Sequence, residues 1–296
     1  MYSSSWQTKF QRKIQKKVYQ LLPTDKILKR PVFIVGCGRS GTTILGKMLS
    51  QHSEIAYFNE PRDIWLCATQ TDIWTRKAQV RSGKLKLTAA DLTPEIASRI
   101  KNEFAVRIRL KNGSRLVEKL PINSFRIGFL NALFPDALFI HLLRNGLEVA
   151  QSIATLAETK PWFGRKDYKW NLLKDYAVAR GDGELVELST NNFLKGILEW
   201  RLSVESSREG LSNLASDRWI EIRYEDLLEN AIAVCTTLEQ FIGLEPSQEM
   251  RQFAATQINR KSPRISQNSL SPAIEQIAGE LLTRLNYTYG KEELLK

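Results

Sequence analysis

The sequence predicts an α/β fold in which helices flank a core sheet of parallel strands. Three observations support this prediction. Short apolar runs at 32–36 and 137–143 pass directly into segments with helical spacing, as in alternating strand–helix units. The run 137–143, ALFIHLL, is apolar along its whole length, which is typical of a parallel strand covered on both faces. The chain has 296 residues, of which 43% are hydrophobic, so a large buried core can form.

The remaining elements follow in chain order. Thr93 is a preferred N-cap residue and Pro94 fits a first helical turn, so a helix begins near residue 92. Pro135 and Asp136 interrupt the helical spacing that precedes them. The alternation of strands and helices favours one parallel sheet with helical insertions. Strands are predicted at 32–36, 54–58, 115–120, 137–143 and 218–224, and helices at 42–51, 92–110, 124–134, 145–154 and 191–215.

Residues 1–30 are predicted to form a basic amphipathic segment ahead of a single α/β domain at 31–296. The segment carries eight basic side chains and one acidic one. Within 6–22, apolar residues recur at every fourth position from Trp6 to Leu22, which indicates a helix. This helix either docks on the domain with a solvated basic face or lies on a membrane surface. A transit peptide is a third interpretation.

The charge of the chain is concentrated in patches. The net charge is +11, and residues 72–119 hold a second basic patch of twelve basic and five acidic side chains. Such patches fit an anionic substrate or a membrane surface better than uniform nucleic-acid binding, so we expect no nucleic-acid partner. Without a long apolar run or a signal peptide, and with three scattered cysteines, we expect a cytoplasmic protein, and peripheral membrane contact through 6–22 is one of the interpretations of that helix. Two histidines leave little material for a zinc site or a histidine-based triad.

The stretch VFIVGCGRSGTTILGKML, residues 32–49, runs from an apolar strand through three glycines into a helix. This arrangement cradles phosphate groups, and dinucleotide redox, phosphoryl transfer and sulfuryl transfer all use it. Gly36, Gly38 and Gly41 satisfy G-x-G-x-x-G. An acidic residue about 20 positions later, Glu54 or Glu60, would then bind ribose, so a Rossmann NAD(P) or FAD oxidoreductase is one alternative.

Phosphoryl transfer from a nucleoside triphosphate fits the loop poorly. Thr42 stands where a P-loop has its lysine, and no apolar strand ends in an aspartate that could hold magnesium. Sulfuryl transfer fits best, because backbone N–H groups with Arg39, Ser40, Thr42 and Thr43 could hold a 5′-phosphosulfate without a metal. The alternative without a ligand is a glycine turn that only caps a core helix.

A second anion-binding pair follows the strand at 137–143. Arg144 stands at the carboxyl end of this strand, and Ser152 lies about two turns into the next helix. Ligands bind at such strand ends in parallel sheets, so the pair could hold a second phosphate. Arg144 could instead pair with a surface acid.

The motifs GCGRSGTT and RNGLEVAQS together resemble sulfotransferases that use 3′-phosphoadenosine 5′-phosphosulfate (PAPS), over about residues 31–290. The subgroup most similar contains tyrosylprotein and Golgi-type carbohydrate sulfotransferases, which have arginine in the loop. The resemblance implies a P-loop-type sheet, PAPS as co-substrate, adenosine 3′,5′-bisphosphate (PAP) as product and no metal. The residues implied to bind PAPS are Gly38, Arg39, Ser40, Gly41, Thr42 and Thr43 at the phosphosulfate, Arg144 and Ser152 at the 3′-phosphate, Tyr224, and Arg264 with Arg260 and Lys261 as neighbouring alternatives.

The resemblance also implies three catalytic residues. Glu60, 21 residues after Arg39, matches the general base of the tyrosylprotein-like group, and can serve if burial raises its pKa toward neutrality. Otherwise Glu60 is a surface acid paired with Arg62 or Arg126. Lys119 matches a family lysine near the reacting sulfur, where it and Arg39 would stabilise charge on the bridging oxygen.

The acceptor is predicted from the stretch KPWFGRKDYKW, residues 160–170. Aromatic rings interleaved with cations suit a carbohydrate hydroxyl on sugars that carry negative charge, with the patch at 72–119 lining the approach. A tyrosine of an acidic peptide is the alternative acceptor, and a core-facing loop with a solvated edge is the alternative without a ligand. A non-catalytic basic protein that binds nucleic acid or membrane explains only the N-terminal helix. The aromatic residues concerned are Trp162, Phe163, Tyr168 and Trp170, the cations are Arg165, Lys166 and Lys169, and Trp200, Trp219 and His141 are assigned to the core.

Overall fold

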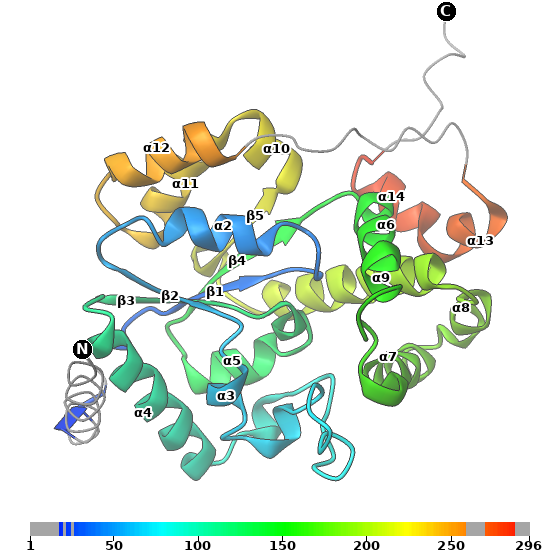
Figure 1. Cartoon of the computed structure of the whole chain (residues 1–296), viewed down its shortest axis with the longest axis horizontal. Coiled ribbons are helices and arrows are strands. Elements are labelled where there is room, and N and C mark those ends of the chain that lie inside the picture. Colours follow the sequence, from blue (N-terminus) through cyan, green and yellow to red (C-terminus); the bar gives the residue numbers. More distant parts are fainter. Residues whose placement is uncertain (1–17, 20–21, 25–26, 259–269, 288–296) are drawn as a thin grey trace, which may run out of the picture.

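The structure is a computed structural model that describes residues 18–19, 22–24, 27–258 and 270–287. Five parallel strands form its central sheet in the order β2-β3-β1-β4-β5 (Figure 1). The predicted α/β fold with a parallel sheet is therefore confirmed. The strands are β1 (Val32–Val35), β2 (Ile55–Asn59), β3 (Arg115–Lys119), β4 (Leu138–Leu143) and β5 (Trp219–Arg223).

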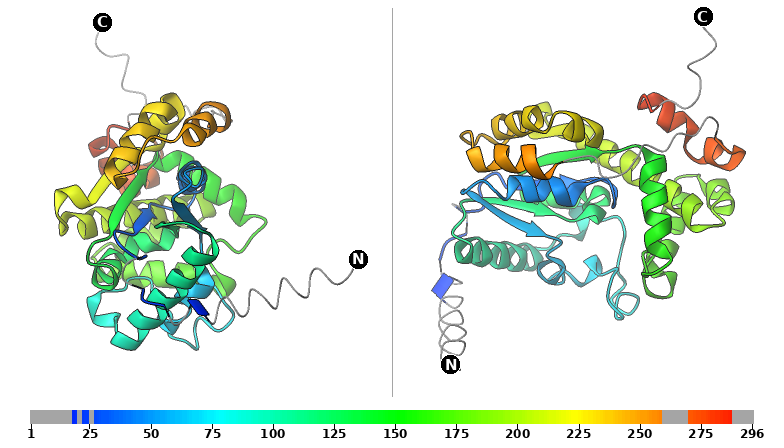
Figure 2. Two further views of the ribbon diagram at one scale, coloured as in Figure 1. Left: turned by 90° about the vertical axis from the view of Figure 1, so that its left-hand side faces the viewer. Right: turned by 45° about the horizontal axis from the view of Figure 1, so that its top comes forward.

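Helices cover both faces of this sheet. Along β1, Val32 and Ile34 pack into one apolar cluster, while Phe33 and Val35 pack into the other, as alternating side chains of a strand must. Both views in Figure 2 keep the yellow and orange helices on one side of the strands and the teal helices on the other. One face carries α2 (Thr42–Leu49), α11 (Ala231–Ile242) and α12 (Gln248–Gln257); the other carries α3 (Arg62–Trp65), α4 (Pro94–Leu110), α5 (Ile127–Leu133), α6 (Gly146–Ala157) and α9 (Asn192–Ser212).

Several short elements extend this core. Helices α6 and α9 pack closely, with the Gly196 backbone against Ala150. Among the residues that the structure describes, no helix is long and apolar enough to cross a membrane. The other helices are α7 (Tyr168–Ala179), α8 (Gly183–Leu188), α10 (Tyr224–Glu229), α13 (Pro272–Ile274) and α14 (Glu280–Arg284).

The predicted helix at 124–134 is wrong in its boundaries. A 3₁₀ turn occupies Pro121–Phe125, and α5 begins only at Ile127. Arg126, with φ −131° and ψ 18°, is non-helical between them, and its buried guanidinium donates to backbone carbonyls of the loop 69–87. By contrast, Thr93 caps α4 as predicted and Pro94 occupies its first turn.

Two groups of predicted residues lie outside the described residues. The basic helix at 6–22 falls there almost entirely, and so do Arg264, Arg260 and Lys261. The division into a segment at 1–30 and a domain at 31–296 therefore stays a prediction.

The carboxyl ends of the strands position the candidate site. Because all strands are parallel, these ends meet at one edge of the sheet. Each strand is followed, or ended, by residues singled out in the sequence: the glycine loop at 36–43 after β1, Glu60 after β2, Lys119 at the end of β3, Arg144 after β4 and Tyr224 after β5.

Candidate active site

The glycine loop depends on glycine at two positions. Gly36 has φ +144°, and a Cβ there would lie 2.4 Å from the Leu142 carbonyl oxygen. Gly41 has φ +94°, and a Cβ there would lie 2.4 Å from the ring of Tyr224. The loop therefore passes directly over β4 and beneath Tyr224, in a conformation that side chains other than glycine rarely adopt.

The loop presents backbone donors to one small cavity. The N–H groups of Gly41, Thr42 and Thr43 begin α2 and have no acceptor within the described chain. Free donors and a helix N-terminus together attract anions. We call this cavity, of about 290 Å³, the loop cavity; its lining is Arg39, Gly41, Thr42, Thr43, Ile44, Lys47, Arg144 and Tyr224.

The two predicted phosphate motifs are joined directly. Arg39 Nε donates to Ser152 Oγ at 3.0 Å, and Arg144 Nη1 donates to the Arg39 carbonyl at 2.9 Å. The Arg144 guanidinium also lies 4.4 Å from the centre of the Tyr224 ring. Residues from the glycine loop, the end of β4, α6 and the start of α10 therefore converge. Arg144 also pairs with Glu148, an acid as its alternative interpretation required.

Sequence analysis missed Lys47 in this cavity. It stands one helical turn after Thr43 on α2 and lines the same space. Spacing at i and i+4 from a loop threonine was the available signal. Its ammonium adds a second cation beside Arg39 for an anionic ligand.

Glu60 and Lys119 meet at the ends of adjacent strands. Asn59 of β2 is in register with Lys119 of β3, so the next residue, Glu60, reaches the lysine. Lys119 Nζ donates to Glu60 Oε1 at 2.8 Å, and Arg62 Nη2 donates to Glu60 Oε2 at 2.7 Å. Glu60 adopts φ +51°, a conformation uncommon outside glycine that is often found at functional sites.

The predicted pKa of Glu60 is wrong in direction. Burial raises it, but the hydrogen bonds and charges of Lys119 and Arg62 outweigh burial, so the pKa lies below its ordinary value of 4.5. Glu60 is thus ionised and able to accept a proton at neutral pH. Beside it, burial raises the pKa of Glu118 to about 8, despite hydrogen bonds from Trp65 and Asn123. Glu118 is therefore mostly protonated at pH 7 and adds little negative charge near Glu60.

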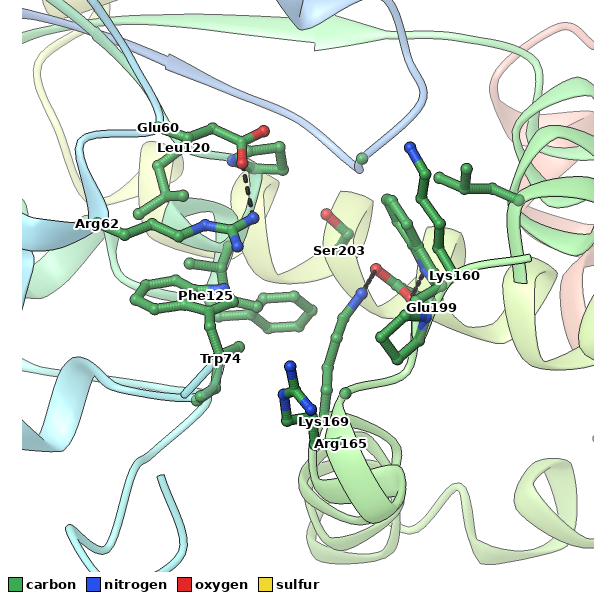
Figure 3. Close-up of a pocket in the computed structure, with 18 residues that line it drawn as sticks. Glu60, Arg62, Trp74, Leu120, Phe125, Lys160, Arg165, Lys169, Glu199 and Ser203 are labelled. Atoms are coloured by element: carbon green, nitrogen blue, oxygen red, sulfur yellow. Dashed lines mark hydrogen bonds and ion pairs between the residues drawn. The ribbon is translucent and has the colours of Figure 1, made fainter. Parts of the chain in front are cut away.

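A larger cavity of about 520 Å³, the wide cavity, opens beside Glu60 (Figure 3). Gly38 of the glycine loop lines it, so the two cavities adjoin along this loop. Figure 3 shows the Glu60–Arg62 pair and the Lys169–Glu199 pair at opposite sides of the view. The lining residues come from five stretches: Gly38; Glu60, Arg62, Ile73 and Trp74; Leu120, Pro121, Ile122 and Phe125; Leu156, Lys160, Pro161, Trp162, Gly164, Arg165 and Lys169; and Glu199 and Ser203.

Only one of the four aromatic residues predicted to meet the acceptor lines this cavity. Trp162 does so, and its ring covers Gly38, where a Cβ would come within 2.6 Å of it. Phe163 and Trp170 instead pack edge-to-face in the core, with ring centres 5.6 Å apart. The Tyr168 hydroxyl donates to the Gly83 carbonyl. Sequence periodicity could not separate Trp162, whose ring lines the cavity, from the three aromatic residues that do not.

The predicted role of the basic patch at 72–119 is also corrected. None of its described arginines or lysines lines the wide cavity, although Trp74 from the same stretch does. Several of these cations form ion pairs with acidic side chains elsewhere in the chain, such as Arg81 with Asp72 and Arg107 with Asp63. The cations at the cavity are Arg62, Lys160, Arg165 and Lys169.

Two buried polar residues that the sequence singled out, Arg126 and His141, lie outside both cavities. Arg126 is not a partner of Glu60; it binds carbonyls of the loop 69–87 and lies 5.7 Å from the Trp74 ring, so it holds Trp74 in place. His141 is fully buried and contacts Glu221 at 2.9 Å, as a core residue.

Within the described ranges, no group of three or more His, Cys, Asp or Glu side chains could hold a metal ion.

Comparison with known proteins agrees with this geometry. The human protein-tyrosine sulfotransferase 1 is 30% identical over 148 residues, 47% of this chain and 39% of that protein. The Drosophila melanogaster protein-tyrosine sulfotransferase is 25% identical over 207 residues, 67% of this chain and 34% of its own length. The matched region thus spans well under half the length of these relatives.

Solved structures share the fold. A sulfotransferase from Mycobacterium avium matches with a TM-score of 0.57 at 16% identity, over 95% of this chain and 82% of that one. The sulfotransferase domain of the curacin biosynthetic pathway matches with a TM-score of 0.53 at 18% identity, over 86% and 98%. The profile described as "Sulfotransferase family" matches residues 31–249, from β1 through the start of α12. This match decides against the dinucleotide alternative, and the chain belongs to the sulfotransferase family.

Proposed function

We propose that this protein transfers a sulfuryl group from PAPS to a hydroxyl group of an acceptor in the wide cavity. The observation that carries the proposal is the position of the Glu60–Lys119 pair. It stands at the strand ends beside the glycine loop, along which the loop cavity and the wide cavity adjoin. Glu60 therefore presents a proton acceptor to the wide cavity, and the buried Lys119, which lines neither cavity, holds it there from the end of β3.

The loop cavity fits the PAPS phosphates. Its free N–H donors, Arg39 and Lys47 suit the phosphosulfate. Arg144 at the edge of this cavity, with Ser152 beyond the lining and bonded to Arg39, suits the 3′-phosphate. Gly38 and Ser40 complete the loop, and the ring of Tyr224 offers a stacking face. Arg264, outside the described residues, remains a proposed contact. PAPS supplies the activated sulfuryl group, and PAP is the product.

Glu60 is proposed as the general base. Its ionised carboxylate takes the proton of the acceptor hydroxyl, while Lys119 and Arg39 stabilise negative charge on the bridging oxygen. The Lys119 ammonium has three N–H bonds, of which one holds Glu60. If Lys119 turns away from Glu60 toward this charge, the carboxylate loses a donor and its pKa rises, which makes it a stronger base at that moment. Because these two cations supply the charge stabilisation, we propose transfer without a metal.

A carbohydrate hydroxyl is our first candidate for the acceptor. The wide cavity has the volume of a small-molecule site, and Trp74 and Trp162 offer ring faces among four cations. A protein tyrosine is the second candidate, favoured by the names of the curated relatives. The low pKa of Glu60 also favours it, because a weak base suits the more acidic phenol hydroxyl.

Nucleotide binding tests the family assignment at the level of this chain. PAP, ADP and NAD are compared at equal concentration by the shift of the thermal unfolding midpoint. A ligand at about 100 times its Kd adds roughly 2.7 kcal/mol to stability, which is a shift of a few degrees. We expect PAP to give the largest shift. A shift with NAD and none with PAP would refute the proposal.

Transfer of ³⁵S from labelled PAPS then separates the two acceptors. Chondroitin and heparan sulfates represent carbohydrates, and an acidic peptide with one tyrosine represents proteins, with its phenylalanine counterpart as control. Incorporation into the polysaccharides supports the first candidate. Incorporation only into the tyrosine peptide replaces it with the second.

A further inference from the structure

The wide cavity has a second polar end, away from Glu60, that the proposed reaction leaves without a role. Glu199 and Ser203 lie four residues apart on α9, so they share one face of that helix. Lys169 Nζ donates to Glu199 Oε1 at 2.6 Å, and Trp162 Nε1 donates to Glu199 Oε2 at 2.9 Å. We call Ser203, Glu199 and Lys169 the distal subsite.

Ser203 is the part of this subsite that points to a ligand. It lines the cavity and is only 2% exposed, and no oxygen or nitrogen atom in the described part of the chain is its hydrogen-bond partner. Its hydrogen-bonding neighbour is the buried Cys37 thiol, and sulfur is a weak hydrogen-bond partner. A buried hydroxyl with only a weak partner gains stability from a stronger one. Rotation about a single bond can turn this hydroxyl toward an oxygen in the cavity.

The charge at this end of the cavity is positive. Lys169 keeps two N–H bonds beyond the one to Glu199. Lys160 and Arg165 line the same cavity, and their side chains have no partner among the described residues. Three cations thus face one acid, Glu199, whose two oxygens are already engaged. This balance favours a ligand group that is negatively charged and accepts hydrogen bonds.

We propose that the distal subsite binds an anionic oxygen group of the acceptor, a carboxylate or a sulfate ester, while the hydroxyl to be sulfated lies at Glu60. In Figure 3 the Ser203 hydroxyl is drawn between the Glu60–Arg62 pair and the Lys169–Glu199 pair. The acceptor therefore carries two functional groups, one that reacts and one that anchors it. This inference rests on the proposed function, because it assigns the wide cavity to the acceptor.

Equilibrium binding to the full-length enzyme saturated with PAP tests the subsite without turnover. The sugar probes are 4-nitrophenyl β-D-glucuronide, with a carboxylate, the 6-O-sulfated glucoside, with a sulfate ester, and the neutral glucoside. The phenol probes are 3-(4-hydroxyphenyl)propanoate and its neutral amide. We expect the charged member of at least one series to bind about tenfold or more tightly, and the stronger sugar anion identifies the preferred group.

Ser203→Ala is the decisive variant, and Ser207→Ala is its matched control. Ser207 lies one turn further along α9, is buried and also has an unpartnered hydroxyl, but it does not line the cavity. We expect Ser203→Ala to weaken binding of the charged probe about tenfold without lowering the unfolding midpoint, and Ser207→Ala to leave binding unchanged. In the double variant Lys169→Met/Glu199→Gln, which leaves no unpaired buried charge, we expect the preference for the charged probe to disappear.

The outcomes separate the two proposals. Absence of PAP binding by the unaltered protein overturns the proposed function. If PAP binds but neither series favours its charged member, or neither series binds, the distal subsite is refuted. Equal losses in Ser203→Ala and Ser207→Ala also refute it, because both serines would then serve only helix packing.

Discussion

The loop cavity and the wide cavity differ in how the chain builds them. In the loop cavity most of the lining, from Arg39 to Lys47, comes from one continuous stretch of sequence. The wide cavity draws its lining from five separated stretches between residues 38 and 203. Backbone donors of a loop and helix dominate the first, whereas side chains dominate the second. A site built from one turn binds the same chemical group in any protein that has that turn. A site built from several segments can change its ligand specificity when any one of those segments changes.

The pair between the cavities, Glu60 and Lys119, gives the largest expected effect. Glu60→Gln removes the base but keeps an oxygen that can accept from Lys119. We expect kcat to fall about 10²–10⁴-fold, with PAP affinity unchanged, measured by ³⁵S transfer and by PAP binding. Asp63→Asn, three residues later in α3, exposed and paired with Arg107, is the control and should stay active. Normal turnover by Glu60→Gln would remove Glu60 from the catalytic role.

Gly41→Ala should damage the loop cavity and spare the wide one. The new Cβ would collide with Tyr224 in a conformation with φ +94°, so the loop or the ring must move. We expect PAP affinity to fall about tenfold or more, measured by calorimetry. Gly181→Ala is the matched control, because Gly181 has φ +87° with nothing within 4 Å of its Cβ. It should cost only about 1 kcal/mol of stability and no PAP affinity; equal effects of the two would show that backbone strain alone is responsible.

Trp74→Leu should damage the wide cavity and spare the loop cavity. Its indole lines the wide cavity and is flanked by Arg62 and Arg126, at 5.2 and 5.7 Å from the ring centre. Loss of this ring face should weaken binding of 4-nitrophenyl β-D-glucuronide to the PAP complex about fivefold, and Trp74→Phe should restore most of it. If PAP affinity fell as well, the two cavities would not be independent sites.

The pH dependence of kcat/KM should show no loss through the mildly acidic range. The pKa of Glu60 in the free enzyme lies below 4.5, so the carboxylate stays deprotonated and able to accept a proton down to that pH. Activity due to Glu60 is therefore present above its lowered pKa and is lost only as pH falls through it. Initial rates from pH 8 to pH 4 check this expectation. An acidic limb near pH 6 or 7 would mean that another group, or a Glu60 without its Lys119 partner, controls the reaction.

Local patterns in the sequence determined much of this protein. The continuous apolar run at 137–143 predicted a buried parallel strand, because only a strand covered on both faces tolerates such a run. The glycine spacing predicted the phosphate loop, because left-handed backbone angles and close approach to β4 exclude other residues at Gly36 and Gly41. Arg144 was identified at the end of a strand, where a parallel sheet places its ligands, whereas Tyr224 was implied only by the family resemblance.

Only the tertiary structure decided the contacts between distant segments. The sequence offered Arg62 as an alternative partner of Glu60, but it could not tell that Lys119 would hold the same carboxylate, so the direction of its pKa was predicted wrongly. Nor could it tell that Phe163 and Trp170 turn into the core while Trp162 faces the wide cavity. The physical reason is the same in both cases. A pKa and the burial of a ring depend on neighbours tens of residues away, and the register and packing that choose those neighbours arise only when the whole chain folds.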